Sequence, residues 1–248
     1  MKILLWTSTF HPVLGGVQTV TKQIAHMLNE DGNDVCILTK QYPLSLPRQE
    51  LVDGIKIYRL LELPINQSTW GVKYSFKWAI SKVLNRYNSF FVKKLIKCFD
   101  PDVVNIHFPD FQIRYMANIN WSSKVRTIWS FHGHDILRYY CVENGYIRNS
   151  LKLLSKHENN TLLDLKSAMI QADVITCCSN WLSSKVLKVF KDDTIPEPLT
   201  LYNCVDLARF NEDNSDAIES KVPYIFAFGR IEEHKGFQDL ISAFGIMS

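Results

Sequence analysis

Short apolar runs recur along this chain, and their length and spacing constrain its fold more than any other feature. They are rich in Val, Ile and Leu, and longer segments separate them: 3–7, 35–39, 55–60, 103–107, 126–131, 174–178 and 199–202. Strands that are buried on both faces of a parallel sheet have this continuous apolar composition. The sequence therefore predicts a parallel sheet whose strands are joined by helices.

The segment between the first two runs has the spacing of an amphipathic helix. Apolar residues at Val17, Val20, Ile24, Met27 and Leu28 form one stripe, and the polar turn 29–33 ends it. Strand and helix alternate in this way along most of the chain. The predicted fold is α/β, with a doubly wound Rossmann-like parallel sheet.

A polar segment near the carboxyl end suggests a domain boundary. We expect a first domain over 1–210, a linker over 211–222 and the start of a second Rossmann-like domain over 223–248. In the last segment, 224–228 reads as a strand, and a helical pattern begins at Phe237. One strand and one short helix cannot bury a core alone, so we expect this second domain to be incomplete.

Composition excludes several classes of protein. With 46% hydrophobic and 21% charged residues the chain is globular, and its net charge of +3 does not predict a nucleic-acid partner. The six cysteines contain no CxxC pair, which favours reduced thiols and a cytoplasmic location. The apolar start is too short for a signal peptide.

Two adjacent glycines, Gly15 and Gly16, lie between the first strand and the first helix. Glycines allow a ligand to approach the backbone, and free amides at a helix N-terminus attract anions. The loop is not a GxGxxG motif, so it does not favour a dinucleotide site. A flexible turn explains the two glycines equally well.

Two histidines lie at the ends of predicted strands: His107 ends one, and His132 ends another in the run 130–135, which continues with Gly133 and Asp135. Carboxyl ends of parallel strands face the ligand crevice of an open sheet, so we expect His107, His132 and Asp135 at the cleft. A zinc site of His132, His134 and Asp135 is the weaker alternative, because it lacks a distant third ligand.

Two cations follow the predicted strand of the second domain. Arg230 and Lys235 lie in the segment that opens the last helix. Fixed cations beside free helix amides suit a diphosphate, although exposed cations are often only solvated.

The stretch Trp70–Phe99 combines lysines, arginine and aromatic residues and contains no acid. Such a helix binds an anionic membrane surface or an acidic lipid acceptor. It fits equally well as helices that cover the sheet with their aromatic residues and extend their lysines to solvent.

The order of these motifs resembles that of family 4 glycosyltransferases. It comprises the Gly15-Gly16 loop followed by VVNIHFP at 103–109, SFHGHD at 130–135, DVITCCSNWLSSKV at 173–186, LYNCVDLARF at 201–210 and FGRIEEHKGFQDLISAF at 228–244. The resemblance covers nearly the whole chain. It implies the GT-B fold, in which two Rossmann-like domains close on a nucleotide sugar.

The resemblance also implies an activity. Members transfer a sugar from a nucleotide sugar to a saccharide or lipid-linked acceptor with retention of configuration, and no metal or other cofactor is expected. It implies that Gly16 lies near substrate phosphate and that His132 faces the donor sugar. Arg230 and Lys235 then hold the donor diphosphate. We expect a role in cell-surface polysaccharide or glycolipid synthesis, with peripheral contact at the inner face of the membrane.

The chain departs from the family pattern in two places. Cys204 stands where the family usually has Gly, between Asn203 and Asp206, which mark the end of the first domain at the cleft. The Glu-x7-Glu motif of the second domain is expected beyond Ser248. We therefore expect slow transfer by residues 1–248 alone.

Two other functions compete with the transferase. The chain fits a non-catalytic acceptor-binding fragment, or a first domain that needs a separate chain to complete its donor site. An NAD enzyme is the weakest alternative, because the chain lacks GxGxxG and an acid after the second strand.

Overall fold

The computed structural model describes residues 1–62, 72–110, 112–116, 119, 121–122, 124–143, 156–191, 193–205, 207, 223–229, 231 and 233–247. The chain divides into two compact units, Met1–Cys204 and Val205–Ser248. The first contains the sheet and the second contains the last helix, and each is described by itself. The predicted linker, 211–222, lies outside the described residues.

An eight-stranded sheet in the order β3-β4-β2-β1-β5-β6-β7-β8 forms the first unit. All neighbouring strands are parallel except β3 and β4. The strands are β1 (Lys2–Thr7), β2 (Asp34–Lys40), β3 (Gln49–Val52), β4 (Ile55–Leu60), β5 (Val103–His107), β6 (Arg126–Phe131), β7 (Val174–Cys177) and β8 (Leu199–Thr200). The predicted doubly wound parallel sheet is confirmed.

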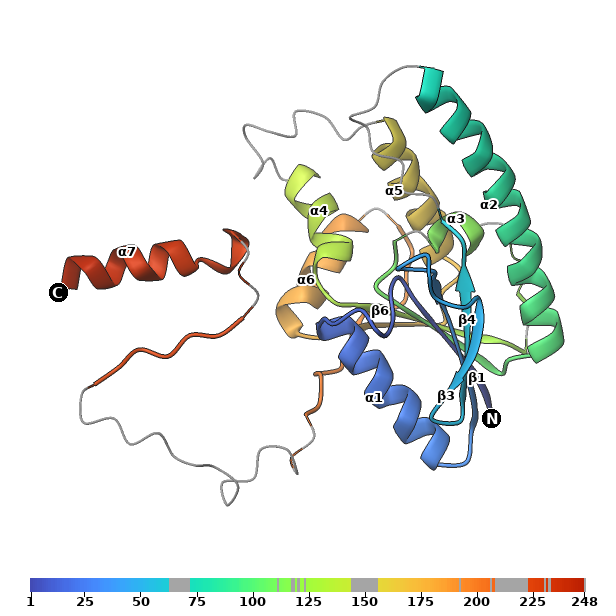
Figure 1. Cartoon of the computed structure of the whole chain (residues 1–248), viewed down its shortest axis with the longest axis horizontal. Coiled ribbons are helices and arrows are strands. Elements are labelled where there is room, and N and C mark those ends of the chain that lie inside the picture. The colour runs from blue at the N-terminus through green and yellow to red at the C-terminus, as the bar shows by residue number, and fades with distance from the viewer. Residues whose placement is uncertain are drawn as a thin grey trace. The chain divides into compact units, whose positions relative to one another are not determined.

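Helices connect the strands and cover both faces of the sheet (Figure 1). They are α1 (Gly16–Glu30), α2 (Val72–Phe99), α3 (Ile113–Met116), α4 (His134–Glu143), α5 (Lys156–Met169) and α6 (Asn180–Val189). A buried sheet with helices on its two faces explains why the strands are apolar on both sides.

The alternation of side chains along β1 separates two hydrophobic clusters. Leu4 and Trp6 belong to the larger cluster, which α2 helps to cover, whereas Ile3 and Leu5 belong to the smaller cluster beside α1. Each of these four side chains is buried. β1 therefore lies at the centre of both layers, as expected from strand geometry.

The antiparallel strand β3 was missed by the sequence analysis. It pairs with β4 through a turn at Asp53 and Gly54, whose φ angles are 50° and 79°. An Asp-Gly pair between short strands is a strong hairpin signal, because both turn residues need positive φ. The signal was present, but the polar composition of 49–52 hid the strand.

The predicted apolar stripe on α1 is only partly buried, and this expectation needs correction. The buried residues of α1 are Thr21 and Ala25, while Met27 is 56% exposed. Ile24 and Leu28 are half-buried and pack against the smaller cluster, and Val20 and Ile24 also line a cavity. The stripe therefore contacts the core through Ile24 and Leu28, while Met27 does not belong to the packed face.

Helix α2 covers the larger cluster through Val92 and Leu95. Its predicted basic stretch begins at Trp70, which lies outside the described residues. No helix in the described part of the chain is both long enough and apolar enough to span a membrane.

The second unit contains the short 3-10 turn η3 (Glu233–Lys235) and α7 (Phe237–Met247). The helix was predicted, but the strand predicted at 224–228 is wrong: these residues form no ladder with any described segment. A strand exists only when a neighbour accepts its hydrogen bonds, and sequence composition does not supply that neighbour.

Candidate functional site

A cavity of about 200 Å³ opens at the carboxyl ends of the parallel strands. The described residues that line it all belong to the first unit. The lining residues are Val20, Ile24, His107, Ser130, Phe131, His132, Thr176, Cys177, Cys178, Leu201, Tyr202, Asn203 and Cys204.

The position of this cavity follows from the order of the strands. β1 lies between β2, which follows it through α1, and β5, which comes later in the chain. In open α/β sheets ligands bind where the order reverses, outside the carboxyl ends of the strands. The cavity lies on the β5 side of this reversal, with α1 as one wall.

His107 and His132 meet at this edge. The Nδ1 atom of His107 lies 3.1 Å from Nε2 of His132, and the ring centroids are 5.4 Å apart. His107 is 2% exposed, whereas His132 is half-buried and lines the cavity. The contact arises because β5 and β6 pair in register at His107 and Ser130, two residues before His132.

Burial keeps both imidazoles neutral. It lowers the pKa of His107 to about 3, with a further decrease from the neighbouring His132, and it lowers the pKa of His132 to about 4. Desolvation disfavours a charged imidazolium, so each ring carries one proton at pH 7.

Asp135 lies beside this pair but does not line the cavity. Its carboxylate is fully buried and accepts hydrogen bonds from the backbone N–H groups of His132, Gly133 and Ile136 at 2.9, 2.7 and 3.2 Å. Burial raises the pKa of Asp135 to about 6, although these hydrogen bonds oppose the increase. Asp135 therefore shapes the turn that carries His132 into α4.

Gly133 completes this turn with φ of 138°, a backbone conformation that residues with a side chain rarely adopt. The glycine allows the chain to leave β6 and enter α4 within two residues. A side chain at this position would strain the turn beside His132.

A chain of hydroxyl groups crosses three strands next to the histidines. Thr176 donates a hydrogen bond to Ser130 at 2.8 Å, and Ser130 donates to the amide oxygen of Asn105 at 2.9 Å. Ser130 and Thr176 both line the cavity. The sequence analysis missed them, although their position at or near strand ends was a usable signal.

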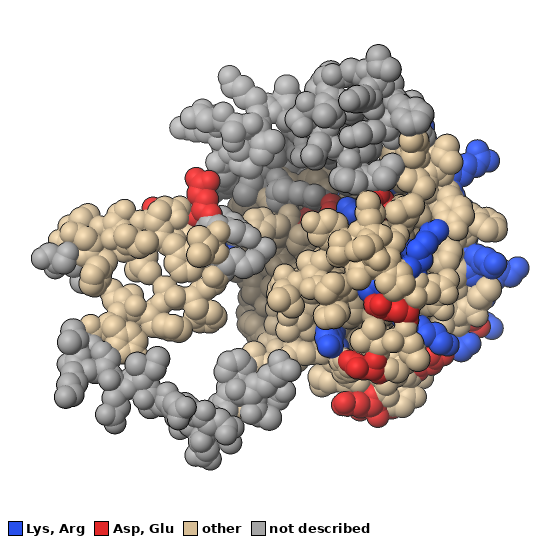
Figure 2. Space-filling model, viewed as in Figure 1, with Lys and Arg blue, Asp and Glu red and all other residues tan. Residues whose placement is uncertain are grey.

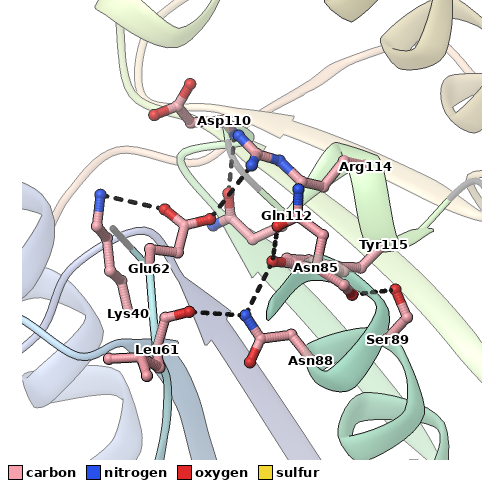
Figure 3. A network of polar contacts seen from close by, with 10 residues as sticks. All are labelled: Lys40, Leu61, Glu62, Asn85, Asn88, Ser89, Asp110, Gln112, Arg114 and Tyr115. Carbon is pink, nitrogen blue, oxygen red and sulfur yellow. Dashed lines mark hydrogen bonds and ion pairs between the residues drawn. The ribbon is translucent and has the colours of Figure 1, made fainter. Parts of the chain in front are cut away.

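A second polar network supports the strand end that carries His107 (Figure 3). Gln112 donates from its amide to the carbonyl oxygens of His107 and Phe108, at 3.3 and 3.4 Å. Its amide oxygen accepts from the N–H of Asp110 at 2.9 Å. Gln112 is fully buried, so these bonds fix the loop after β5.

The same network joins this loop to the ends of β2 and β4. Glu62 forms ion pairs with Lys40 at 3.1 Å and with Arg114 at 3.5 Å. Next to it, Asn88 of α2 donates to the carbonyl of Leu61 and to the hydroxyl of Tyr115. Figure 3 shows these side chains converging from several elements on one polar centre.

The glycine pair lies at the start of α1. Gly15 is the N-cap residue and Gly16 the first helical residue, and neither a side-chain cap nor an acid in the first turn satisfies the helix amides. A Cβ atom at Gly16 would meet no heavy atom within 4 Å. The two glycines do not line the cavity itself; Val20, one turn later, does.

Of the other predicted site residues, Asn203 lines the cavity together with Cys204, which replaces the expected glycine. Asp206 and Arg230 lie outside the described residues. Lys235 ends η3, is exposed, and precedes the start of α7 by two residues. It belongs to the second unit.

The alternative zinc site finds no support in this geometry. Asp135 directs its carboxylate to backbone amides, and His134 is exposed. Within the part of the chain that the structure describes, no three His, Cys, Asp or Glu residues form a group suited to a metal ion.

Comparison with known proteins decides the family. The model of Glycosyltransferase Family 4 matches residues 14–209, which include the cavity. The chain belongs to glycosyltransferase family 4. A search of curated proteins gave no significant match to this family 4 chain.

Two structures of one solved protein share the fold of this chain. Sucrose-phosphate synthase from Thermosynechococcus elongatus matches with a TM-score of 0.53 and 12% identity over 81% of the family 4 chain and 47% of that protein. A second structure of that synthase gives a TM-score of 0.50 and 9% identity, over 85% and 93% of the respective chains. Starch synthase IV from Arabidopsis thaliana, bound to ADP and acarbose, gives 0.49 and 14%, over 86% and 54%.

The family 4 chain spans about half the length of the first of these proteins. At such low identity the likeness concerns the fold. The sheet of the first unit is the Rossmann-like sheet of GT-B glycosyltransferases, as its motifs predicted.

Proposed function

We propose that this chain forms the acceptor-side part of a retaining glycosyltransferase. The reaction moves a sugar from a nucleotide sugar to a saccharide or lipid-linked acceptor. The observation that carries the proposal is the cavity at the strand ends, lined by His107 and His132, in a chain of family 4. Neutral His132 then contacts the donor sugar and orients it without acting as a charged acid.

The proposed chemistry requires positive charge at the leaving group. In glycosyl transfer the diphosphate departs with growing negative charge, so groups that meet this charge stabilise the transition state more than the ground state. Lys235 beside the start of α7, together with Arg230, supplies that charge in the proposal. Within the first unit, the uncapped amides of α1 also form a positive helix end that favours anionic groups.

The test is sugar transfer by a protein that carries this chain, using a panel of UDP-, GDP- and ADP-sugars with saccharide and lipid acceptors. We expect one donor to give a product with retained anomeric configuration, measured by the proton coupling of the new linkage. Chelation of divalent metal should leave the rate unchanged. A product of inverted configuration, or no product with any donor, would contradict the proposal.

A matched pair of variants localises the reaction. His132→Ala is expected to abolish most transfer, whereas His26→Ala, on the far part of α1 beside Asp53, should leave it unchanged. Equal loss in both variants would mean that His132 has no special role.

A second candidate function is acceptor binding without catalysis. It is favoured by the observation that the described residues lining the cavity all belong to Met1–Cys204. The two functions are separated by the same assay: a binding module holds an acceptor saccharide, seen by ligand NMR, but produces no transfer product with any nucleotide sugar.

We further propose that the outer face of α2 contacts an anionic membrane surface. Val83, Tyr87 and Phe90 are 69%, 48% and 67% exposed, at helical spacing. The exposed charged side chains of its described part are all basic: Lys82, Arg86, Lys93, Lys94 and Lys97. Figure 2 shows Lys and Arg along the right-hand edge, where α2 runs in Figure 1.

This combination suits a helix that lies on a membrane rather than one that crosses it. Exposed apolar side chains enter the interface while flanking cations attract anionic lipid. The proposal places the protein in the cytoplasm, at the inner face of the cell membrane, where lipid-linked acceptors are within reach. The opposite face of α2 packs against the larger cluster through Val92 and Leu95. In this proposal one helix therefore covers the sheet with one face and binds the membrane with the other.

A further inference from the structure

The side chains of His107 and His132 share one hydrogen bond, and this bond can carry only one proton. It joins Nδ1 of His107 to Nε2 of His132 over 3.1 Å. One nitrogen must donate and the other must accept, because two N–H groups facing each other would repel and two lone pairs would form no bond. The proton on the contact therefore fixes the tautomers of both rings.

Both rings are neutral under ordinary conditions. Burial lowers the pKa of each imidazole well below 7. Each ring then has one N–H and one unprotonated nitrogen. Only two arrangements of the pair remain.

The second nitrogen of His107 distinguishes these arrangements. Its Nε2 atom is buried and has no hydrogen-bond partner, and His107 as a whole is 2% exposed. If His132 donated to His107, the proton of His107 would sit on this unpartnered Nε2. In protein interiors an N–H group without an acceptor is rarer than an acceptor without a donor. Leaving Nε2 unprotonated is therefore the better arrangement.

The second nitrogen of His132 has a different environment. Within the described residues the side chain of His132 makes no hydrogen bond except the one to His107, and its Nδ1 is not among the buried atoms that lack a partner. His132 is half-buried and lines the cavity. Its Nδ1 therefore has access to the cavity or to solvent.

We propose that His107 is a positioning residue that sets the tautomer of His132. His107 donates its Nδ1–H to Nε2 of His132, so His132 holds its proton on Nδ1 and presents a hydrogen-bond donor to the cavity. His132 is then unable to accept a proton from a ligand through the nitrogen that faces it.

This tautomer defines the chemistry that the cavity recognises. An N–H donor binds an oxygen acceptor, such as a hydroxyl or phosphate oxygen of a bound sugar derivative. Ser130 and Thr176 line the same cavity, but their hydroxyl protons are used within the chain of hydroxyl groups that ends at Asn105. His132 therefore offers a donor that the neighbouring hydroxyl groups do not offer. The recognition of a sugar oxygen rests on the proposed function, whereas the assignment of the tautomer does not.

The experiment is 15N NMR of the ligand-free protein with labelled histidine at pH 7. One-bond and two-bond couplings to ring protons distinguish an Nδ1–H tautomer from an Nε2–H tautomer. The variant His132→Ala removes one set of signals and assigns it. We expect His132 and His107 both as Nδ1–H tautomers. An Nε2–H tautomer at His132, or a doubly protonated ring, overturns the proposal.

The variant His107→Leu tests whether His107 is the cause. Its removal should release His132, so that the Nε2–H tautomer becomes populated while His26 signals keep their positions. If His132 remains wholly Nδ1–H in the folded variant, His107 does not set the tautomer. His107→Asn provides a smaller polar replacement whose amide N–H occupies the place of Nδ1, and it should retain the Nδ1–H form. Loss of that form in folded His107→Asn would equally contradict the mechanism.

No substrate is present in these measurements. A wrong tautomer therefore leaves the proposed transferase untouched, and a failed transferase assay leaves the tautomer untouched.

Discussion

The two units of the chain contain the same local pattern with opposite results. Each has an apolar segment, a glycine-containing loop and a helix: 3–7 with Gly15 and α1, and 224–228 with Gly229 and α7. In the first unit the apolar segment is a central strand whose residues Ile3–Trp6 are at most 4% exposed. In the second, Phe226 and Phe228 are 75% and 86% exposed.

The difference shows that an apolar strand pattern indicates which residues are able to form a strand, but not whether they pair with a neighbour. β1 has hydrogen-bonded neighbours on both sides, and helices cover both of its faces. The segment 224–228 pairs with no described strand. Burial of apolar surface stabilises a fold only where a partner surface exists to exclude water.

The largest expected effect compares two phenylalanines. Phe190 at the end of α6 is 2% exposed, and Phe228 is 86% exposed. Phe190→Ala removes a packed ring and leaves a cavity, so we expect a loss of about 3–5 kcal/mol in the free energy of unfolding. Phe228→Ala should change it by less than about 0.5 kcal/mol. Urea denaturation measures both, and similar losses would mean that the second unit buries this ring.

The next effect separates activity from stability. Lys235 is exposed, and the proposal places it at the leaving diphosphate. In any form of the protein that transfers sugar, Lys235→Ala should lower turnover by about 30- to 1,000-fold, or about 2–4 kcal/mol of transition-state stabilisation. The unfolding midpoint should not move. His132→Ala, in the first unit, should lower turnover while nucleotide affinity stays nearly constant; a loss of nucleotide binding instead would refute this division.

A smaller effect concerns the pH dependence of the first unit. His107 and His132 have folded pKa values of about 3 and about 4, below the ordinary 6.5, so between about pH 6 and 4 the unfolded chain binds two more protons at these two residues. Asp135, with a folded pKa of about 6, binds one more proton when folded. Stability should therefore fall with acidification by at most about 1.4 kcal/mol per pH unit.

The control for this slope is His107→Asn, which removes one of the two histidines. The balance of protons between folded and unfolded chains then approaches zero, and the dependence of the urea midpoint on pH should flatten. A variant with the slope of the parent protein would show that His107 does not titrate as its burial requires.

The smallest effect compares two exposed apolar faces. The outer face of α2 carries cations beside Val83 and Phe90, whereas α7 exposes Ile241 and Phe244 without any Lys or Arg in the helix. Vesicles with anionic lipid should bind the protein through α2, with about 1 kcal/mol lost per removed cation. Lys93→Gln with Lys94→Gln should weaken sedimentation with vesicles.

The matched control is Ile241→Ser, which changes an exposed apolar residue of α7 and should have no effect on vesicle binding. Salt should release the bound protein, because charge attraction is screened over about 10 Å at 0.1 M. Binding that persists in high salt, or that depends on Ile241 instead, would argue against a basic membrane face on α2.

Much of the first unit was predictable from residue patterns. The bounds of β4, β5 and β6 are those predicted, because an apolar run ends where the chain leaves a sheet that is buried on both faces. The placement of His107, His132 and Asn203 around one cavity agrees with the expectation that strand ends share an edge. The role of each residue there stays a prediction.

Other features depended on information that composition does not contain. The 3.1 Å contact between His107 and His132 requires the register of β5 on β6, and nothing in either segment specifies it. Asp135 was expected at the cleft, but its carboxylate is used by the backbone of its own turn. The exposed state of 224–228 depends on partners, and a sequence window does not show whether these are present.

One side chain, Arg59, links the loop before α1 to the β3–β4 hairpin at the edge of the sheet. Arg59 of β4 is 1% exposed; it pairs with Glu50 of β3 and donates to the carbonyl of His11, in the loop that leads to the glycine pair. A buried guanidinium that loses its partners is strongly unfavourable. Grafting a new glycine loop therefore requires the edge hairpin to be transferred with it, and natural variants that lengthen one are expected to adjust the other.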